Sequence, residues 1–149
     1  MTQLKHPTSP PVADPLEVLS AQRPWWLICL EVFIAVQAVY GGVSLVVGAW
    51  GLDPGPLPVV DDWTLPGIAL VLVVAAPMLT AAWLELWAHP QAALASLVAG
   101  TLLMGWIALQ LLLLPSMHLW LQPVCLLAGA LVAGGGLRRW RRPPLRRSR

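Results

Sequence analysis

Few residues of this chain have side chains suited to chemistry, and most of them lie inside long apolar stretches. Two carboxylic acids, Glu31 and Glu85, interrupt runs that otherwise consist of aliphatic and aromatic residues. An ionisable group in such a run is by default a candidate functional site, because a charge is expensive to bury there. The chemistry open to such a carboxyl is proton binding, the passage of an ion, or an ion pair with a basic residue.

Three glutamines and one histidine also lie within the apolar stretches. The candidate intramembrane polar residues are Glu31, Gln37, Glu85, Gln110, His118 and Gln122. His118 and Gln122 are four residues apart and therefore share a helix face, where Gln110 can join them from the preceding helix. We expect hydrogen bonds there that close one end of a bundle. Zinc takes three or four ligands, and one histidine does not supply them. The sequence therefore predicts no metal and no cofactor.

Catalytic motifs are absent from the sequence. It contains no CxxC pair, G-x-S-x-G elbow, HExxH motif, phosphate-binding loop or dinucleotide fingerprint. His6, His89 and His118 are expected at different depths, so they cannot form a cluster. Cys29 and Cys125 are also expected at different depths, and this argues against a disulfide. The chain is not predicted to be an enzyme, and no catalytic residue is assigned.

The elements that position these residues follow from composition. Of the 149 residues, 58% are hydrophobic and only 11% are charged, whereas a soluble domain carries about 25% charged residues. Because about 20 apolar residues span a bilayer, the sequence predicts four transmembrane helices, over residues 25–50, 65–88, 91–114 and 117–137. Residues 1–24, rich in proline and polar groups, read as a flexible arm, and 138–149 as a basic tail.

The distribution of charge predicts how these helices are oriented. Seven of the nine basic residues lie between Arg138 and Arg149, while the loop after the first span carries Asp53, Asp61 and Asp62 and no base. Positive charge near helix ends stays in the cytoplasm. With four spans, both termini are then expected in the cytoplasm of a bacterial cell, with the chain in its plasma (inner) membrane. The basic residues Arg138, Arg139, Arg141 and Arg142 are expected to face anionic lipid headgroups, which we favour over nucleic acid as their partner.

The inner carboxyls have several interpretations. Glu31 lies about 9 Å from the inner end of its span at 1.5 Å per residue. We expect it to reach water or to pair with Arg138 or Arg139, and we retain a role in protonation or transport and a contact with another chain as alternatives. Glu85, between Trp83 and Trp87, is expected at the membrane interface, where tryptophans gather.

Small residues, and residues that disrupt a helix, predict how the helices pack. Rows of small residues at four-residue spacing, which allow close helix contacts, occur at Ala92, Ser96 and Gly100, at Cys125, Gly129 and Ala133, and at Gly41, Ser44 and Gly48. Gln37 is expected to hydrogen-bond across the contact made by the last row. Pro77 is expected to kink the second span, and the glycines at 134–136 are expected to loosen the end of the fourth.

Short segments in a fixed order resemble a known group. The pattern YGG…DPG…PG…GWI..Q…LQP is similar to that of small bacterial four-span integral membrane proteins with no assigned function. It is carried by Tyr40, Gly41, Gly42, Asp53, Pro54, Gly55, Pro66, Gly67, Gly105, Trp106, Ile107, Gln110, Leu121, Gln122 and Pro123. The resemblance covers roughly residues 25–137. It implies a four-helix membrane fold and confers no activity.

The sequence therefore predicts an all-α membrane protein with four antiparallel transmembrane helices. The leading functional interpretation is a small non-enzymatic accessory or interaction subunit of a membrane assembly, with a membrane-protein partner or self-association. The alternative is a small oligomeric transporter or channel that uses Glu31 and Gln37.

Overall fold

The computed structural model describes residues 23–49, 62–113 and 121–141, and these residues form an all-α fold. The helices are α2 (Trp25–Val46), α3 (Thr64–Leu70), the π-helical turn η1 (Val71–Ala75), α4 (Ala76–Leu86), α5 (Ala92–Leu113) and α6 (Leu121–Trp140). Helices α3, η1 and α4 follow one another without a break and form one span. The described residues thus contain four helices that are long and apolar enough to cross a membrane, which confirms the predicted fold class.

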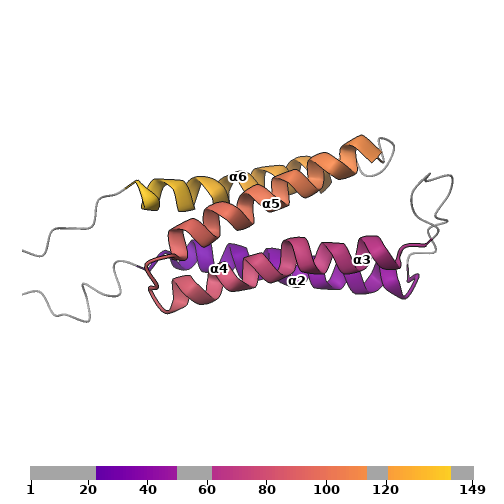
Figure 1. Cartoon of the computed structure of the whole chain (residues 1–149), viewed down its shortest axis with the longest axis horizontal. Coiled ribbons are helices and arrows are strands. Elements are labelled where there is room, and N and C mark those ends of the chain that lie inside the picture. Colours follow the sequence, from indigo (N-terminus) through magenta and orange to yellow (C-terminus); the bar gives the residue numbers. More distant parts are fainter. Residues whose placement is uncertain (1–22, 50–61, 114–120, 142–149) are drawn as a thin grey trace, which may run out of the picture.

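The four spans run alternately up and down along one axis (Figure 1). One end of the bundle holds the start of α2, the turn between α4 and α5, and the end of α6. We call it the basic end, because Arg23, Arg138, Arg139 and Arg141 lie there. Asp62 lies at the opposite end, where its carboxylate accepts a hydrogen bond of 3.0 Å from the Thr64 backbone N–H at the start of α3.

Helix α6 differs most from the predicted boundaries. It continues regularly through residues 134–136 to Trp140, so that Arg138 and Arg139 lie in its last turn. The prediction that these glycines loosen the helix was wrong. A Cβ atom on Gly136 would come within 2.6 Å of the Ala93 carbonyl oxygen. The missing side chain therefore allows α6 to contact α5, and this packing outweighs the low helix propensity of glycine.

Two rows of small residues predicted from the sequence meet between α5 and α6. A Cβ atom on Gly100 would lie 2.5 Å from the backbone nitrogen of Ala133 and 2.6 Å from the carbonyl oxygen of Gly129. Backbones that approach this closely gain van der Waals contact, which holds helices together where lipid supplies no hydrophobic driving force. The prediction for this helix pair is confirmed.

Only part of the row of small residues in the first span is buried in the bundle. Gly41 and Ser44 are buried, but Gly48 lies beyond α2 with a φ of +65° and has open space around it. The close contact is made instead by Gly42, whose added Cβ atom would lie 2.7 Å from the carbonyl oxygen of Gly67 on α3. The sequence pattern thus identified the helix face but not the contacting glycine.

Pro77 is accompanied by a widened helical turn. Because proline has no backbone N–H, it cannot donate to the helical ladder, and the π-helical turn η1 lies just before it. Local π adjustments of this kind are a known response to proline in membrane helices. The Thr80 hydroxyl donates a 2.8 Å hydrogen bond to the Ala76 carbonyl oxygen in the same region.

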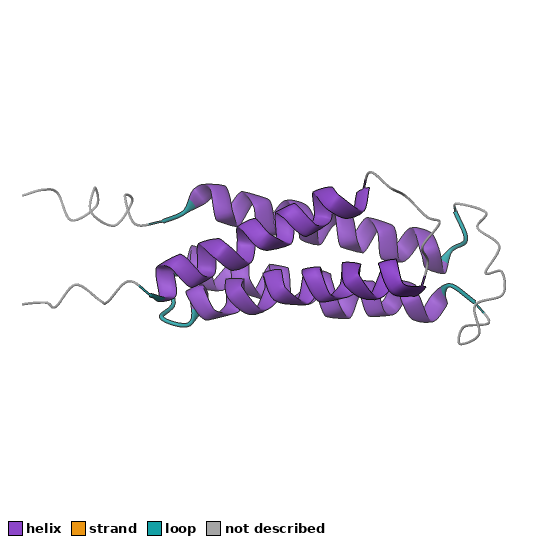
Figure 2. Ribbon diagram, turned by 90° about the horizontal axis from the view of Figure 1, so that it is seen from above, coloured by secondary structure: helices purple, strands orange, loops and turns teal. Residues whose placement is uncertain are grey.

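The core is made of aliphatic residues from all four spans. Its fully buried members include Leu27, Ala35, Met78, Ala99 and Val132. Toward the Asp62 end, α5 and α6 diverge from α2 and α3 in Figure 1, whereas at the basic end α5 packs against α4. Figure 2 shows the same four spans from above. The basic end is therefore where all four spans converge, and the buried polar residues described below lie in this region.

Candidate functional site: a buried carboxyl cluster

Each of the four spans contributes one polar residue to a group near the basic end. We call Glu31 of α2, Glu85 of α4, Ser96 of α5 and Arg139 of α6 the carboxyl cluster. Glu31 and Ser96 are fully buried and Glu85 is 1% exposed, whereas the Arg139 side chain is 33% exposed. Two acids and one base are thus brought together from positions far apart in the sequence.

The tight turn after α4 brings Glu85 close to the start of α5. The His89 N–H donates to the Leu84 carbonyl oxygen at 2.9 Å, and the Ala88 N–H donates to that of Glu85 at 3.1 Å. This pair of bonds is the Schellman motif, which ends a helix with one residue in the left-handed conformation. That residue is Ala88, with a φ of 49°.

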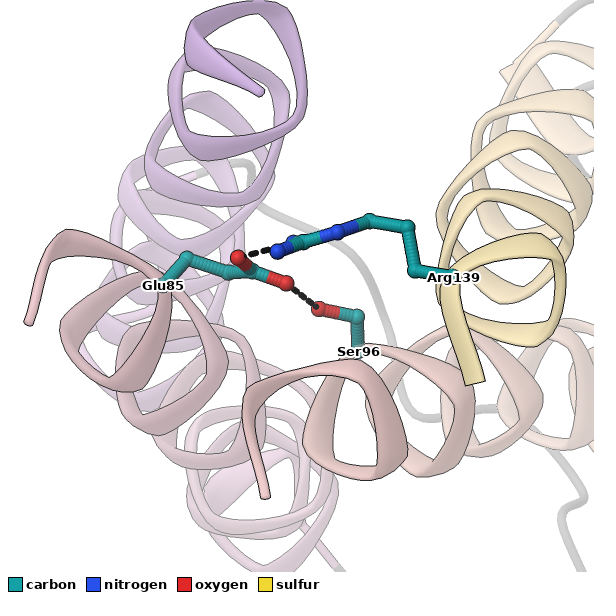
Figure 3. Close-up of polar contacts among 3 residues, drawn as sticks. All are labelled: Glu85, Ser96 and Arg139. Atoms are coloured by element: carbon teal, nitrogen blue, oxygen red, sulfur yellow. Dashed lines mark hydrogen bonds and ion pairs between the residues drawn. The ribbon is translucent and has the colours of Figure 1, made fainter. Parts of the chain in front are cut away.

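Glu85 is held by two partners (Figure 3). The Arg139 guanidinium donates to Oε2 in an ion pair, and the Ser96 hydroxyl donates to Oε1 at 3.4 Å. Glu85 lies at the C-terminal end of α4, where the partial negative charge of the helix dipole disfavours a carboxylate. Arg139 lies at the C-terminal end of α6, where a cation is favoured. The ion pair therefore offsets the unfavourable placement of Glu85 and ties α4 to α6.

Glu31 is buried differently. Both of its carboxyl oxygens are inaccessible and have no hydrogen-bond partner among the described residues. Ser96, Glu85 and Arg139 are close enough to interact with its carboxyl, but the hydrogen bonds of Ser96 and Arg139 go to Glu85. An unpaired carboxyl at 0% exposure is the costliest polar group in the described structure.

The structure bears on three predictions about these residues. Glu31 does not form the expected ion pair with Arg138 or Arg139, because Arg139 pairs with Glu85. Glu85, which was expected at the membrane interface, has its side chain buried between the helices, and its depth in the membrane stays a prediction. Arg139 does not face lipid headgroups, because its guanidinium turns inward to that carboxylate.

The position of Glu85 around the helix could have predicted the direction of its side chain, although the neighbouring tryptophans suggested an interfacial residue. At about 100° per residue, Glu85 lies about 200° around the helix from both Trp83 and Trp87. These tryptophans are 61% and 64% exposed, so the acid between them points into the bundle. Ser96 was also missed as a site residue, because its place in a row of small residues suggested packing alone.

The remaining predicted polar residues lie outside the cluster. Gln37 is exposed, so the expected hydrogen bond across the Gly41 and Ser44 face was wrong. Gln37 is six residues after Glu31, which places it about 240° around α2. Gln110 and Gln122 are half-buried near the Asp62 end. His118 lies outside the described residues, so its predicted partnership with Gln122 stays a prediction.

Three other arginines of the tail were predicted to face lipid headgroups. Arg138 and Arg141 are exposed at the basic end, and Arg142 lies outside the described residues. Trp25, Trp26 and Trp140 are also exposed there, at 53%, 56% and 63%. Exposed arginines beside exposed indoles are typical of a membrane–water interface.

The described residues contain no group of three or more histidine, cysteine or acidic side chains that could hold a metal ion. Cys29 and Cys125 are both free thiols. Two grooves of about 250 Å³ and 430 Å³ are open on the surface, and neither is lined by a member of the carboxyl cluster. The cluster is therefore packed between the helices and does not line either groove.

Taken together, the fold and the exposed apolar surface indicate a class of protein, an integral membrane protein with several spans. No family model matches the chain, and neither a curated protein nor a solved structure matches it. The resemblance to small four-span membrane proteins is thus supported in its fold, by four apolar helices, without a family assignment.

Proposed function

We propose that this chain is a non-enzymatic accessory subunit that binds another membrane protein or a second copy of itself. The observation that supports this proposal is the unequal packing of the spans. Only 17% of the most apolar window of α6 is buried, against 44% for α2. Meanwhile the two buried acids of the spans lie inside the chain, and neither of them lines a surface groove.

The uncovered face of α6 has the character of a helix-packing surface. Leu121, Val124, Leu127 and Leu131 are between 49% and 63% exposed, and a Cβ atom on Gly134 would meet nothing within 4 Å. Large aliphatic side chains beside an open glycine offer the ridge and groove on which membrane helices associate. A partner helix lying along α6 would cover them.

The proposal includes the orientation of the chain. The basic end faces the cytoplasm of a bacterial cell, in accordance with the positive-inside rule, and both termini lie there. Arg138 and Arg141, exposed at this end, contact anionic headgroups of the plasma membrane, each contributing about 1 kcal/mol.

In-cell photo-crosslinking tests the accessory role. A photoreactive amino acid is placed at Leu127 on α6, and a matched control is placed at Leu72 on η1, since these side chains are 63% and 64% exposed. The expected result is a crosslinked product of defined mass from Leu127 and none from Leu72. Mass spectrometry after purification in mild detergent identifies the partner. Crosslinks to lipid alone from both positions would contradict the proposal.

A second candidate function is a small oligomeric transporter or channel, and the unpartnered carboxyl of Glu31 favours it. Intramembrane acids mark many proton and ion pathways. Gln37 and Glu31 do not face one route through a single chain, because Glu31 is buried in the bundle whereas Gln37, about 120° away around α2, is exposed. Flux through vesicles that contain the purified chain, compared between the wild type, Glu31→Gln and Gln37→Ala, measures this alternative.

A further inference from the structure

The carboxyl cluster contains more acidic than basic side chains. It contains two carboxyls, Glu31 and Glu85, and one guanidinium, Arg139. Across the described elements packed around it, no further charge faces the cluster. Helices α3 and α5 and the turn η1 contain no titratable residue, and Arg23, His89, Arg138 and Arg141 are exposed. With both acids ionised, one negative charge would be buried without a counter-charge.

The surroundings of Glu31 leave little room for another ligand. Leu27 and Ala35, one turn before and one turn after it on α2, are both fully buried. A metal cation prefers several oxygen ligands and, for calcium or magnesium, six or more. The neighbouring guanidinium of Arg139 would also repel such a cation. A proton, in contrast, needs no cavity and binds to a single oxygen.

We propose that the carboxyl cluster is a proton-binding site, in which Glu31 holds a proton and Arg139 neutralises the carboxylate of Glu85. The neutral acid gains a donor that the unpartnered oxygens of Glu31 lack, because a protonated carboxyl can donate one hydrogen bond. The cluster then carries no net charge, which removes the main cost of burying it.

The position of Arg139 indicates where the proton exchanges with water and what its release does to the helix packing. Its side chain is one-third exposed at the basic end, so the proton exchanges with water on that side. When the proton leaves, two carboxylates share one guanidinium, and like charges at short range repel. Proton release therefore weakens the contact between α2, which carries Glu31, and α4, which carries Glu85. This inference does not depend on the accessory role.

The chain offers a direct measurement, because it contains only three glutamates, Glu17, Glu31 and Glu85. The full chain is produced with glutamate labelled by ¹³C at the side-chain carboxyl carbon, and purified in mild detergent. Carbon NMR then follows the three carboxyl signals from about pH 4 to about pH 9, a range that brackets the ordinary titration of glutamate near 4.3. Glu17→Gln and Glu85→Gln assign the signals, and Glu17, which precedes the predicted spans, serves as the internal control.

The expected result is one cluster signal that remains in the protonated form at neutral pH, while Glu17 is ionised. Two ionised cluster signals at neutral pH would overturn the proposal. A dependence of the cluster signals on sodium concentration at fixed pH would also overturn it, in favour of a cation site.

A second readout does not require a variant that folds as well as the wild type. The thermal midpoint of the wild type is expected to fall as the pH rises and the cluster loses its proton. Glu31→Gln, which keeps the shape and carries no charge, should flatten this pH dependence whatever its absolute midpoint. An equally steep profile in Glu31→Gln would contradict the assignment of the proton to this site.

Discussion

The carboxylate of Glu85 on α4 accepts a hydrogen bond from the guanidinium of Arg139 on α6, 54 residues later in the chain. This buried ion pair connects the second span to the fourth. Because Ser96 of α5 donates to the same carboxylate, the Glu85 side chain connects its own span to two others. The stability of the basic end should therefore depend on Glu85 more than on any exposed charge there.

Removal of either member of this pair is expected to destabilise the fold. The loss of one partner of a fully buried ion pair costs about 3–5 kcal/mol, and the one-third exposure of Arg139 should place Glu85→Gln and Arg139→Gln below that range. The double variant should lose less than the sum, because no charge is left unpaired. Thermal unfolding in detergent measures the double-mutant cycle. Arg138→Gln is the matched control, and an equal loss in this variant would argue against a specific pair.

A glycine at position 88 is expected to stabilise the turn between α4 and α5. Ala88 has a φ of 49°, and a left-handed residue with a side chain costs about 1 kcal/mol that glycine avoids. Ala88→Gly should therefore raise the thermal midpoint, whereas Ala88→Val should lower it. A fall in the midpoint of Ala88→Gly would show that the turn is not under this strain.

Alanine substitutions should separate the glycines that form helix contacts from those that do not. Gly100→Ala and Gly136→Ala place a methyl group within about 2.6 Å of backbone atoms, and such overpacking costs about 1–3 kcal/mol or more. Gly134→Ala meets nothing within 4 Å and should instead stabilise α6 by up to about 1 kcal/mol. Unfolding measured by circular dichroism compares the three variants. Equal effects at all three positions would contradict the close α5–α6 contact.

Labelling of single cysteines in intact cells tests the proposed orientation. Cys29 and Cys125 are replaced by serine, and one cysteine is introduced at either Asp62 or Arg141, both of which are exposed. A thiol reagent that cannot cross the membrane should modify Asp62→Cys and leave Arg141→Cys unmodified until the cells are opened. The reverse pattern would place the basic end outside the cell.

The sequence predicted the four helices because lipid imposes a simple rule. Each spanning segment must satisfy its own backbone hydrogen bonds and be apolar over about 20 residues, and both conditions can be read along a single segment. The contact of Gly100 with Gly129 was predictable for a similar reason, since small residues at four-residue spacing mark a face.

The partners within the carboxyl cluster depend on information that one helix does not contain. Arg138 and Arg139 are neighbours in sequence, but they point about 100° apart around α6. Which of them faces an acid depends on how α6 is rotated against α5, and glycines along the whole contact set that rotation. Glu31 and Glu85 likewise compete for one arginine, and the outcome depends on the turn at Ala88.

The π-helical turn η1 also determines which helices the second span contacts. Gly67 and Glu85 are 18 residues apart, a distance that makes about five complete turns of an α-helix and would align the two residues on one side. The extra residue in η1 offsets them by about 100°. Gly67 can then meet α2 while Glu85 meets α5 and α6. Deletion of a single residue from Val71–Ala75 would force the span to give up one of these two sets of neighbours.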